Sequence, residues 1–372
     1  SMCILSPKMV EVERHPLITL HTCSEVEKVE GKAGKFIVTV KTYPRYIDEE
    51  RCNGCGDCIL ICPVEVYNRF DAGIGVRKAI YKPHQQAVPD VVIKDNEHCI
   101  ECGLCYGVCG TEAIKNEDDT RITRIQAASI VVSCGYATFD AVHKPQFRYG
   151  DLPDVITSLE LERMISASGP TGGQLKRLST GVTPRRVLFI QCVGSRDLPL
   201  NRPFCSGICC MSAIKNAMLI REHYPDVEVT VCYMDIRAYG KGYEEYYERA
   251  KEAGIRFLRG MPSEIAGDAL SMHVQVENTE TGEVIMLQPD LVVLSVGLRP
   301  ADDAASICEK LGIPLEDTGF IQSLDAKINT VATIRPGIYI AGTAVAPKDI
   351  PDCVAHAGAA AMRAFMDANR EG

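Results

Sequence analysis

Cysteine spacing is the feature of this sequence that most directly suggests chemistry. In the stretch CNGCGDCILICP, residues 52–63, four cysteines follow the pattern C-x-x-C-x-x-C-x-x-x-C, and a proline follows the last of them. The pattern returns in CIECGLCYGVCG, residues 99–110, where Gly110 replaces the second proline. Cysteines at this spacing bind 4Fe–4S clusters, and the fourth cysteine of each run ligates the cluster of the other run.

We therefore expect two 4Fe–4S clusters that exchange their fourth ligands. The first cluster takes Cys52, Cys55, Cys58 and Cys109, and the second takes Cys99, Cys102, Cys105 and Cys62. Gly54, Gly56 and Gly103 allow the loops to turn and to direct backbone N–H groups at sulfur. Zinc is the alternative metal, but zinc ribbons use paired C-x-x-C motifs rather than two runs of four.

A third group of cysteines lies further along the chain. Cys192 stands in FIQCVGSRD, at the end of an apolar strand, and Cys205, Cys209 and Cys210 stand in FCSGICCM, at the start of a helix. Buried free thiols are the alternative interpretation, because cysteine packs as a small hydrophobe. A helix N-terminus favours thiolates, so we expect a third iron–sulfur cluster here. Six isolated cysteines remain: Cys3, Cys23, Cys134, Cys232, Cys308 and Cys353. We interpret most of them as core residues and set Cys3 apart, because it lies at a chain end.

Composition sets broad limits on the class of protein. The chain has 372 residues, 46% hydrophobic and 24% charged, which indicates a globular protein of about two to three domains. A net charge of −9 argues against nucleic-acid binding. The sequence shows no signal peptide and no apolar run of the roughly 18 residues that span a bilayer. Eighteen cysteines clustered at metal-ligand spacing favour metal binding over disulfides, so we expect a cytoplasmic protein.

The segments around the cysteine runs predict that the runs are inserted into another fold. Residues 17–43 alternate like strands, with a hairpin turn at Gly-Lys-Ala-Gly. The cysteine module follows, and the strand pattern resumes at IQAASIVVSCGY, which reaches Gly135. From residue 151, helical and apolar strand patterns alternate, which indicates βαβ units and a parallel sheet.

The strand ends of this α/β part suggest a second cofactor. The segments IVVSCGY, VVLSVGLRP and IYIAGTAVAP each leave a strand through a glycine turn, a geometry that can receive phosphate. They resemble the strand ends of flavoproteins of the thioredoxin-reductase type. This resemblance implies FAD contacts at Gly135, Gly342, Thr343, Ile350, Pro351 and His356. That family usually has Asp at the position of Thr343.

Nucleotide loops are missing from this sequence. No G-x-G-x-x-G opens it, although the fold normally begins with one. After the strand VLFIQ the sequence continues CVGSRD, where a nicotinamide nucleotide would need glycines. We therefore expect a Rossmann-like middle domain that carries the third cluster in place of NAD.

The expected fold is α/β: an incomplete two-dinucleotide-domain flavoprotein, thioredoxin-reductase-like, with an inserted bacterial-type two-cluster ferredoxin domain. FAD-domain segments are expected at 1–43 and 121–150, with a return segment at 287–372. The ferredoxin domain is expected at 44–120 and the Rossmann-like domain at 151–286.

Taken together, these motifs resemble the A subunit of heterodisulfide reductase, the electron-bifurcating flavoprotein family of methanogens and other anaerobes. LSPKMVEVERHP near the start, QCVGSRD and FCSGICC in the middle, and PKDIPDCVAHAGAAA near the end carry the resemblance over nearly the whole chain. The family has an upstream segment with the G-x-G-x-x-G loop and often a further ferredoxin module downstream. This sequence contains neither, so we expect a large internal fragment or one half of a split polypeptide.

The resemblance also implies a function in methanogenesis. FAD takes an electron pair from a partner linked to a hydrogenase or formate dehydrogenase. One electron passes through subunits B and C to the heterodisulfide of coenzymes M and B, and the other passes to ferredoxin. A homodimer within a larger complex is expected, and the fragment alone is expected to bind FAD weakly or not at all. Lys215 and Lys348 are candidates for the cation that stabilises reduced flavin.

Two other classes of function remain open from the sequence. A nicotinamide-dependent flavin disulfide reductase with a ferredoxin input module is the first, although the chain has no clear redox cysteine pair outside the cluster motifs. An electron-transfer or scaffold protein without flavin is the second.

Overall fold

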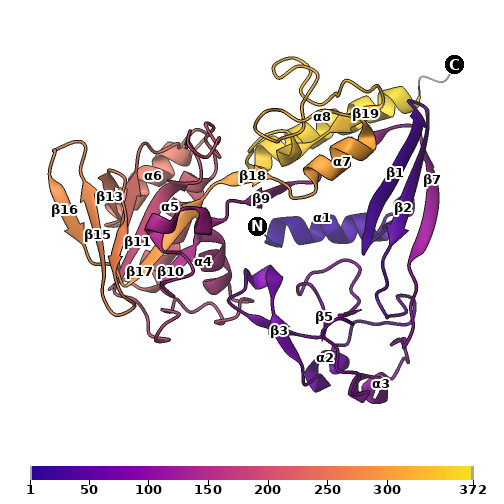
Figure 1. Ribbon diagram of the computed structural model, residues 1–372, viewed down its shortest axis with the longest axis horizontal. Helices are drawn as coiled ribbons and strands as arrows, with labels where there is room; N and C mark the ends of the chain where they lie inside the picture. The colour runs from indigo at the N-terminus through magenta and orange to yellow at the C-terminus, as the bar shows by residue number, and fades with distance from the viewer. Residues whose placement is uncertain (1, 370–372) are drawn as a thin grey trace. The chain divides into compact units, whose positions relative to one another are not determined.

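The computed structural model describes residues 2–369, with side chains described from residue 5 onward. The chain folds as two compact units (Figure 1). The first unit comprises Ser1–Glu30, Ile37–Gln126 and Ser168–Pro170. The second comprises Gly31–Phe36, Ala127–Ala167 and Thr171–Gly372.

The first unit begins with a helix and a three-stranded sheet. Helix α1 spans Met2–Arg14, which the sequence analysis did not anticipate. The sheet has the order β1-β2-β7, with β1 at Ser24–Lys32, β2 at Lys35–Thr42 and β7 at Arg121–Ala127. The hairpin expected at Gly-Lys-Ala-Gly forms between β1 and β2, but no strand forms over residues 17–23.

The cysteine runs of the first unit lie on two matching half-motifs. Helices α2 (Asp57–Ile61) and α3 (Leu104–Val108) pack against each other. Each helix starts after a left-handed glycine, Gly56 at φ 87° or Gly103 at φ 77°, and each ends at the fourth cysteine of its run. Every ligand of the second run follows its counterpart by 47 residues, so the two halves form an internal repeat.

Short strands complete this cysteine-rich part. Strand β3 (Glu65–Tyr67) pairs antiparallel with β4 (Val76–Lys78), and β5 (Ile80–Tyr81) pairs antiparallel with β6 (Ile93–Lys94). A short 3₁₀ helix lies at Arg69–Asp71. The small core holds Ile47, Cys58, Ile80, Val92 and Ala113, and four more cysteines pack against it. Metal bound by these cysteines would supply cohesion that so small a core lacks.

The second unit is built on a five-stranded parallel sheet of order β10-β17-β11-β12-β13. Its strands span Val155–Thr157, Leu291–Val296, Arg186–Val193, Glu228–Tyr233 and Arg256–Arg259 in that order. Every residue of β17, which lies between β10 and β11, is buried, as expected for a parallel strand covered on both faces. The α/β fold expected from the alternating pattern is therefore present.

Different elements cover the two faces of this sheet. Helices α4 (Ser158–Met164) and α5 (Cys209–His223) pack on one face, and α6 (Tyr243–Glu252) packs beside α5 (Figure 1). On the other face lies an antiparallel sheet of β14 (Ile265–Gly267), β15 (Met272–Glu277) and β16 (Val284–Leu287). Val274 and Val276 of β15 share one core with Leu188, Ile190 and Leu294 of the parallel sheet.

The remaining elements of the second unit carry the expected flavin segments. Strand β8 (Ile130–Val132) pairs parallel with β19 (Ile338–Ile340), and β9 (Tyr136–Thr138) pairs antiparallel with β18 (Leu298–Pro300). Helix α8 (Ile350–Ala368) packs on β19 and β8, and α7 (Ala304–Leu311) precedes β19 and α8 in the chain. Short 3₁₀ helices lie at Ala141–His143, Pro145–Phe147 and Gly342–Ala344.

The domain limits expected from the sequence remain predictions. Strand β17 falls within the expected return segment 287–372, yet it pairs with β10 and β11 inside the parallel sheet. None of the described helices is long and apolar enough to cross a bilayer.

A buried ion pair fixes the edge of the parallel sheet, and its loss should be costly. Asp154 is 1% exposed and accepts hydrogen bonds from Arg177 Nε at 2.9 Å and Ser179 N at 3.1 Å. Asp154→Ala leaves the Arg177 guanidinium without its carboxylate, and we expect a loss of about 3–5 kcal/mol in the free energy of unfolding. Urea denaturation followed by circular dichroism measures it. Lys251→Ala, which breaks an exposed pair with Glu248, should cost at most about 0.5 kcal/mol. Equal effects of the two substitutions would contradict the assignment.

Candidate iron–sulfur and flavin sites

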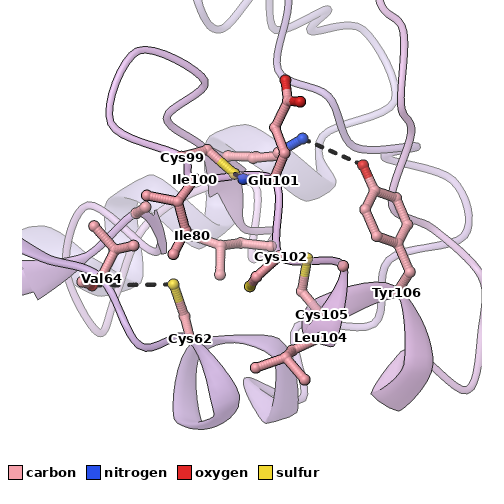
Figure 2. Close-up of a pocket in the computed structure, with 13 residues that line it drawn as sticks. Cys62, Val64, Ile80, Cys99, Ile100, Glu101, Cys102, Leu104, Cys105 and Tyr106 are labelled. Atoms are coloured by element: carbon pink, nitrogen blue, oxygen red, sulfur yellow. Dashed lines mark hydrogen bonds between the residues drawn. The ribbon is translucent and has the colours of Figure 1, made fainter.

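The structure brings Cys62 together with the first three cysteines of the second run. Cys62, Cys99, Cys102 and Cys105 line one pocket, and their sulfur atoms surround the same space (Figure 2). Helix α2 ends at Cys62, so the side chain leaves the first half-motif and enters the second. A cubane cluster is held by four cysteine sulfur atoms, so these four cysteines are suited to hold a 4Fe–4S cluster.

The other four cysteines form the complementary group. Cys58 is buried in the small core, and Cys52 and Cys109 pack against that core. Burial, together with the neighbouring thiols of Cys52 and Cys55, raises the pKa of Cys58 to about 12. Such a thiol keeps its proton at neutral pH unless a metal replaces it, which again fits an iron–sulfur cluster.

Backbone N–H groups of the second half-motif point at sulfur. Glu101 N donates to Cys99 Sγ at 3.4 Å, and Ala113 N donates to Cys109 Sγ at 3.3 Å. Burial raises the pKa of Cys109, but hydrogen bonds from Thr111 and Ala113 outweigh burial and lower the pKa overall. Hydrogen bonds to ligand sulfur stabilise the electron-rich reduced form of a cluster.

Exposure differs among the cysteines of the candidate clusters. Cys55 and Cys102, which occupy equivalent places in the two runs, are exposed. Cys210 is buried, and Cys192, Cys205 and Cys209 are half-buried. Both candidate clusters of the first unit therefore have one ligand that reaches solvent.

The third group of cysteines gathers where β11 ends and α5 begins. The pairing of β11 with β17 shifts register between Ile190 and Val193, and Cys192 adopts a left-handed φ of 60°. Cys209 and Cys210 are the first residues of α5, and Cys205 Sγ accepts from Gly207 N at 3.3 Å. A left-handed cysteine in a strand is strained, and such strain concentrates at functional sites.

Burial and neighbouring thiols perturb two of these four cysteines. Burial and then the Cys210 thiol raise the pKa of Cys192 to about 11. Burial and the thiols of Cys210, Cys192 and Cys205 raise the pKa of Cys209 to about 12. Four cysteines between the end of β11 and the first turn of α5 match the donor set of a cluster, so this group also fits one.

Two buried serines support the third group. The hydroxyls of Ser195 and Ser206 lie 2.6 Å apart, and Ser206 Oγ also accepts from Leu298 N at 2.8 Å. A hydrogen bond between Ser206 and Cys209 opposes the rise in the Cys209 pKa. A Cβ atom at Gly297 would lie 2.2 Å from Ser195 Oγ, so only glycine leaves room for this pair.

The expected flavin contacts assemble in the second unit. Gly342 N donates to His356 Nδ1 at 3.0 Å, and Thr343 follows Gly342 in the turn after β19. Ile350 and Pro351 open α8, where Asp349 caps the helix. A strand end, a tight glycine turn and a helix N-terminus form a geometry that receives a phosphate-bearing cofactor, so this segment fits a flavin.

Three further candidates lie at separate places in this unit. Gly135 follows β8, the parallel neighbour of β19, and has a φ of 79°. Burial lowers the pKa of His356, and Lys348 is close enough to lower it further. Lys215 lies on α5, where its ammonium pairs with Glu162 of α4. The roles of Gly135, Lys348 and Lys215 at the flavin remain predictions.

Sequence reasoning missed the polar residues that support the cysteines. Lys94 and Tyr106 lie beside the second run, and Ser195 and Ser206 lie beside the third group. A lysine that closes the apolar run VVI was the one visible signal for Lys94. The serines gave no signal, because their hydrogen bonds join residues distant in the sequence.

The fold and the sites define an iron–sulfur oxidoreductase with a two-cluster ferredoxin domain and a nucleotide-type α/β domain. Family models agree with this class. A 4Fe–4S dicluster domain matches residues 51–114, and a pyridine nucleotide-disulphide oxidoreductase domain matches residues 212–361. The chain therefore carries iron–sulfur clusters in the first segment and a flavin-type redox domain in the second.

Curated relatives identify the family. The chain is 50% identical over 364 residues to the iron-sulfur A subunit of the CoB–CoM heterodisulfide reductase of Methanocaldococcus jannaschii, a match that covers 97% of this chain and 55% of the relative. It is 48% identical over 368 residues to the A subunit of the H2:CoB–CoM heterodisulfide, ferredoxin reductase of Methanothermobacter marburgensis, covering 98% of this chain and 56% of that protein. The chain thus belongs to the family of heterodisulfide reductase A subunits, and it spans about half the length of these relatives.

Solved structures that match part of the chain include thioredoxin reductases. That of T. acidophilum has a TM-score of 0.42 at 19% identity, over 67% of this chain and 68% of its own. That of Lactococcus lactis has a TM-score of 0.43 at 23% identity, over 68% of this chain and 69% of its own.

The exchange of fourth ligands can be tested with paired substitutions. If Cys62 serves the second cluster, Cys62→Ala and Cys102→Ala should remove the same EPR signal, and the double variant should lose no more iron than either alone. Cys55→Ala should remove the other signal. Cys353→Ala, at a half-buried cysteine of the second unit, is the control and should keep both. Should Cys62→Ala instead remove the signal lost in Cys55→Ala, the exchanged assignment is wrong.

His356 should make the second unit less stable in mild acid. Its ring accepts from Gly342 N through Nδ1 and meets Thr330 through Nε2, and burial lowers its pKa below the ordinary 6.5. As pH falls below 6.5, the unfolded chain takes up a proton that the folded imidazole refuses, so stability falls. Urea midpoints at about pH 7.5 and about pH 5.5 measure this loss. His356→Gln keeps an acceptor and should show a smaller pH dependence; an unchanged dependence would contradict the assignment.

Proposed function

We propose that this chain is the cluster- and flavin-bearing part of a heterodisulfide-reductase-type enzyme. Identity of about half over 97% of the chain to the A subunits of such enzymes carries the proposal, together with a cysteine pocket suited to a cluster. A bound flavin would supply the conversion between two-electron and one-electron transfer, and the clusters would supply one-electron carriers. The substrates at the two ends are ferredoxin and the disulfide of coenzymes M and B.

The residues of this chain position and tune the cofactors. The exchanged ligand Cys62 joins the two half-motifs, so both clusters are held in one rigid body. The Ser206 hydroxyl, which pairs with Ser195, holds the Cys209 side chain, and His356 holds the turn at Gly342. Burial of Cys58 and Cys210 shields one side of the first and of the third cysteine group from water.

We infer the partner proteins from the relatives, not from a binding site described in this chain. Relatives are named for hydrogen, for hydrogen or formate, and for ferredoxin or coenzyme F420H2. We propose that heterodisulfide reductase subunits B and C, a hydrogenase or formate dehydrogenase linker and ferredoxin assemble with this chain, as a homodimer within a larger complex in the cytoplasm.

A nicotinamide-dependent disulfide reductase is the alternative function. The family model over residues 212–361 favours it by name, but the end of β11 carries Cys192 rather than a glycine loop for the nucleotide. Bleaching of bound flavin by NADH would favour this alternative.

Cofactor content tests the proposed function. Protein purified without oxygen should carry about twelve irons per chain if all three cysteine groups hold cubanes, and about eight if the third group holds none. Iron, sulfide and flavin are quantified in the chain alone and after addition of the family's upstream segment. Fewer than about four irons per chain would contradict the proposal. Flavin absent even with that segment would leave an electron-transfer protein without flavin.

A further inference from the structure

A buried lysine lines the pocket of the second cysteine group. Lys94 ends β6, is 6% exposed, and faces the same pocket as Cys62, Cys99, Cys102 and Cys105. Its Nζ donates to Tyr106 Oη at 3.2 Å, the dashed line that ends at Tyr106 in Figure 2. Tyr106 Oη in turn donates to the Lys115 carbonyl at 3.1 Å. The ammonium also lies 5.5 Å from the ring centre of Tyr46 and 5.6 Å from that of Tyr106.

No carboxylate neutralises this lysine. Among the residues whose side chains the structure describes, Lys94 forms no ion pair with Asp or Glu, and its partners are a phenol and two aromatic faces. A buried ammonium without a counter-charge is unfavourable by several kcal/mol and normally loses its proton or acquires a partner. Glu101 also lines this pocket, but among the described side chains no ion pair joins it to Lys94. The other groups around the pocket that can carry negative charge next to Lys94 are the four cysteines.

Comparison of the two halves of the internal repeat shows that only the second half has a lysine at this position. At the 47-residue offset, the counterparts of Lys94 and Tyr106 are Ile47 and Ile59. Ile47 is 3% exposed and lies in the small core with Cys58, and Ile59 packs against that core. The first cysteine group therefore has an apolar residue where the second has a buried cation.

Cations near the first cysteine group are neutralised by carboxylates. Arg51, which precedes Cys52, pairs with Glu112 at 3.0 Å. Lys82 pairs with Asp90, whose backbone oxygen lies 2.4 Å from where a Cβ of Gly54 would be. The unpaired positive charge of Lys94 thus distinguishes the two sites of the repeat.

We propose that Lys94 is the counter-charge of the cluster bound by Cys62, Cys99, Cys102 and Cys105, and that it makes this cluster easier to reduce. Four thiolates around a cubane carry net negative charge, and reduction adds one more electron. A fixed positive charge in a pocket of low dielectric stabilises the reduced form more than the oxidised form. Tyr46 and Tyr106 hold the ammonium at the pocket without neutralising it. This inference rests on the cluster content of the proposed function.

A redox titration of the full chain, followed by EPR, tests the proposal. Cys62→Ala identifies the signal of the second cluster by its absence. In Lys94→Met, which keeps length but removes charge, the equilibrium constant for reducing that cluster should fall at least about tenfold, a shift of about 59 mV for one electron. Lys94→Arg, which keeps the charge, should stay close to the unsubstituted protein.

Matched controls separate charge from packing. Ile47→Met changes the equivalent position of the first half without changing charge, and Lys115→Met removes a half-exposed lysine that pairs with Asp48. Both should leave the second cluster's potential unchanged. A Lys94→Met protein with full iron and an unshifted potential overturns the proposal, as does a shift confined to the first cluster.

Loss of the second cluster in a Lys94 variant also tests whether Lys94 acts through its charge. If Lys94→Met loses iron while Lys94→Arg keeps it at the original potential, the charge is needed and the proposal stands. If both variants lose it, Lys94 acts through packing and the proposal fails. Failure of the proposed function is recognised separately, because the unsubstituted protein would then lack the iron expected of two cubanes before any titration.

Discussion

The first unit depends on one exchange: Cys62 ends the helix of one half-motif, and its sulfur lies with the cysteines of the other. Neither half has a hydrophobic core of its own, and the shared core contains only five fully buried residues. Exchanged ligands tie each half to the other through metal–sulfur bonds, which contribute to folding where apolar burial does not suffice. Each of the two candidate cluster sites needs four sulfur atoms around it. The packing of α2 against α3, the left-handed glycines and the short strands serve this arrangement.

The second unit shows how a nucleotide-type sheet can serve another cofactor. The strand order and the opposing antiparallel layer follow the plan in which a dinucleotide binds at the end of the first strand. Here the pairing of β11 with β17 shifts register near the end of β11, and Cys192 adopts a left-handed conformation. Two cysteines then form the first residues of α5. The helix N-terminus that would favour phosphate favours thiolate for the same electrostatic reason.

Local patterns revealed much of this from the sequence, and distant contacts did not. The cysteine spacing located the ligands, because 4Fe–4S motifs are encoded within a dozen residues. The alternation of strands and helices after residue 151 gave the parallel sheet. The pattern could not show that β17 lies inside that sheet, since pairing with β10 and β11 joins segments about 100 residues or more apart. It also missed α1, a helix with Pro7 inside, and the Ser195–Ser206 pair, which meets only after folding.

Ligand exposure gives the candidate clusters different lifetimes in air. Cys55 and Cys102 reach solvent at equivalent places of the repeat, so dioxygen and chelators can attack one corner of each cluster in the first unit. The third group has a buried Cys210, and Cys209 starts a helix that covers the parallel sheet. These exposed ligands make the surface of the ferredoxin-like part, rather than its core, the place where oxidative damage to bound clusters would begin.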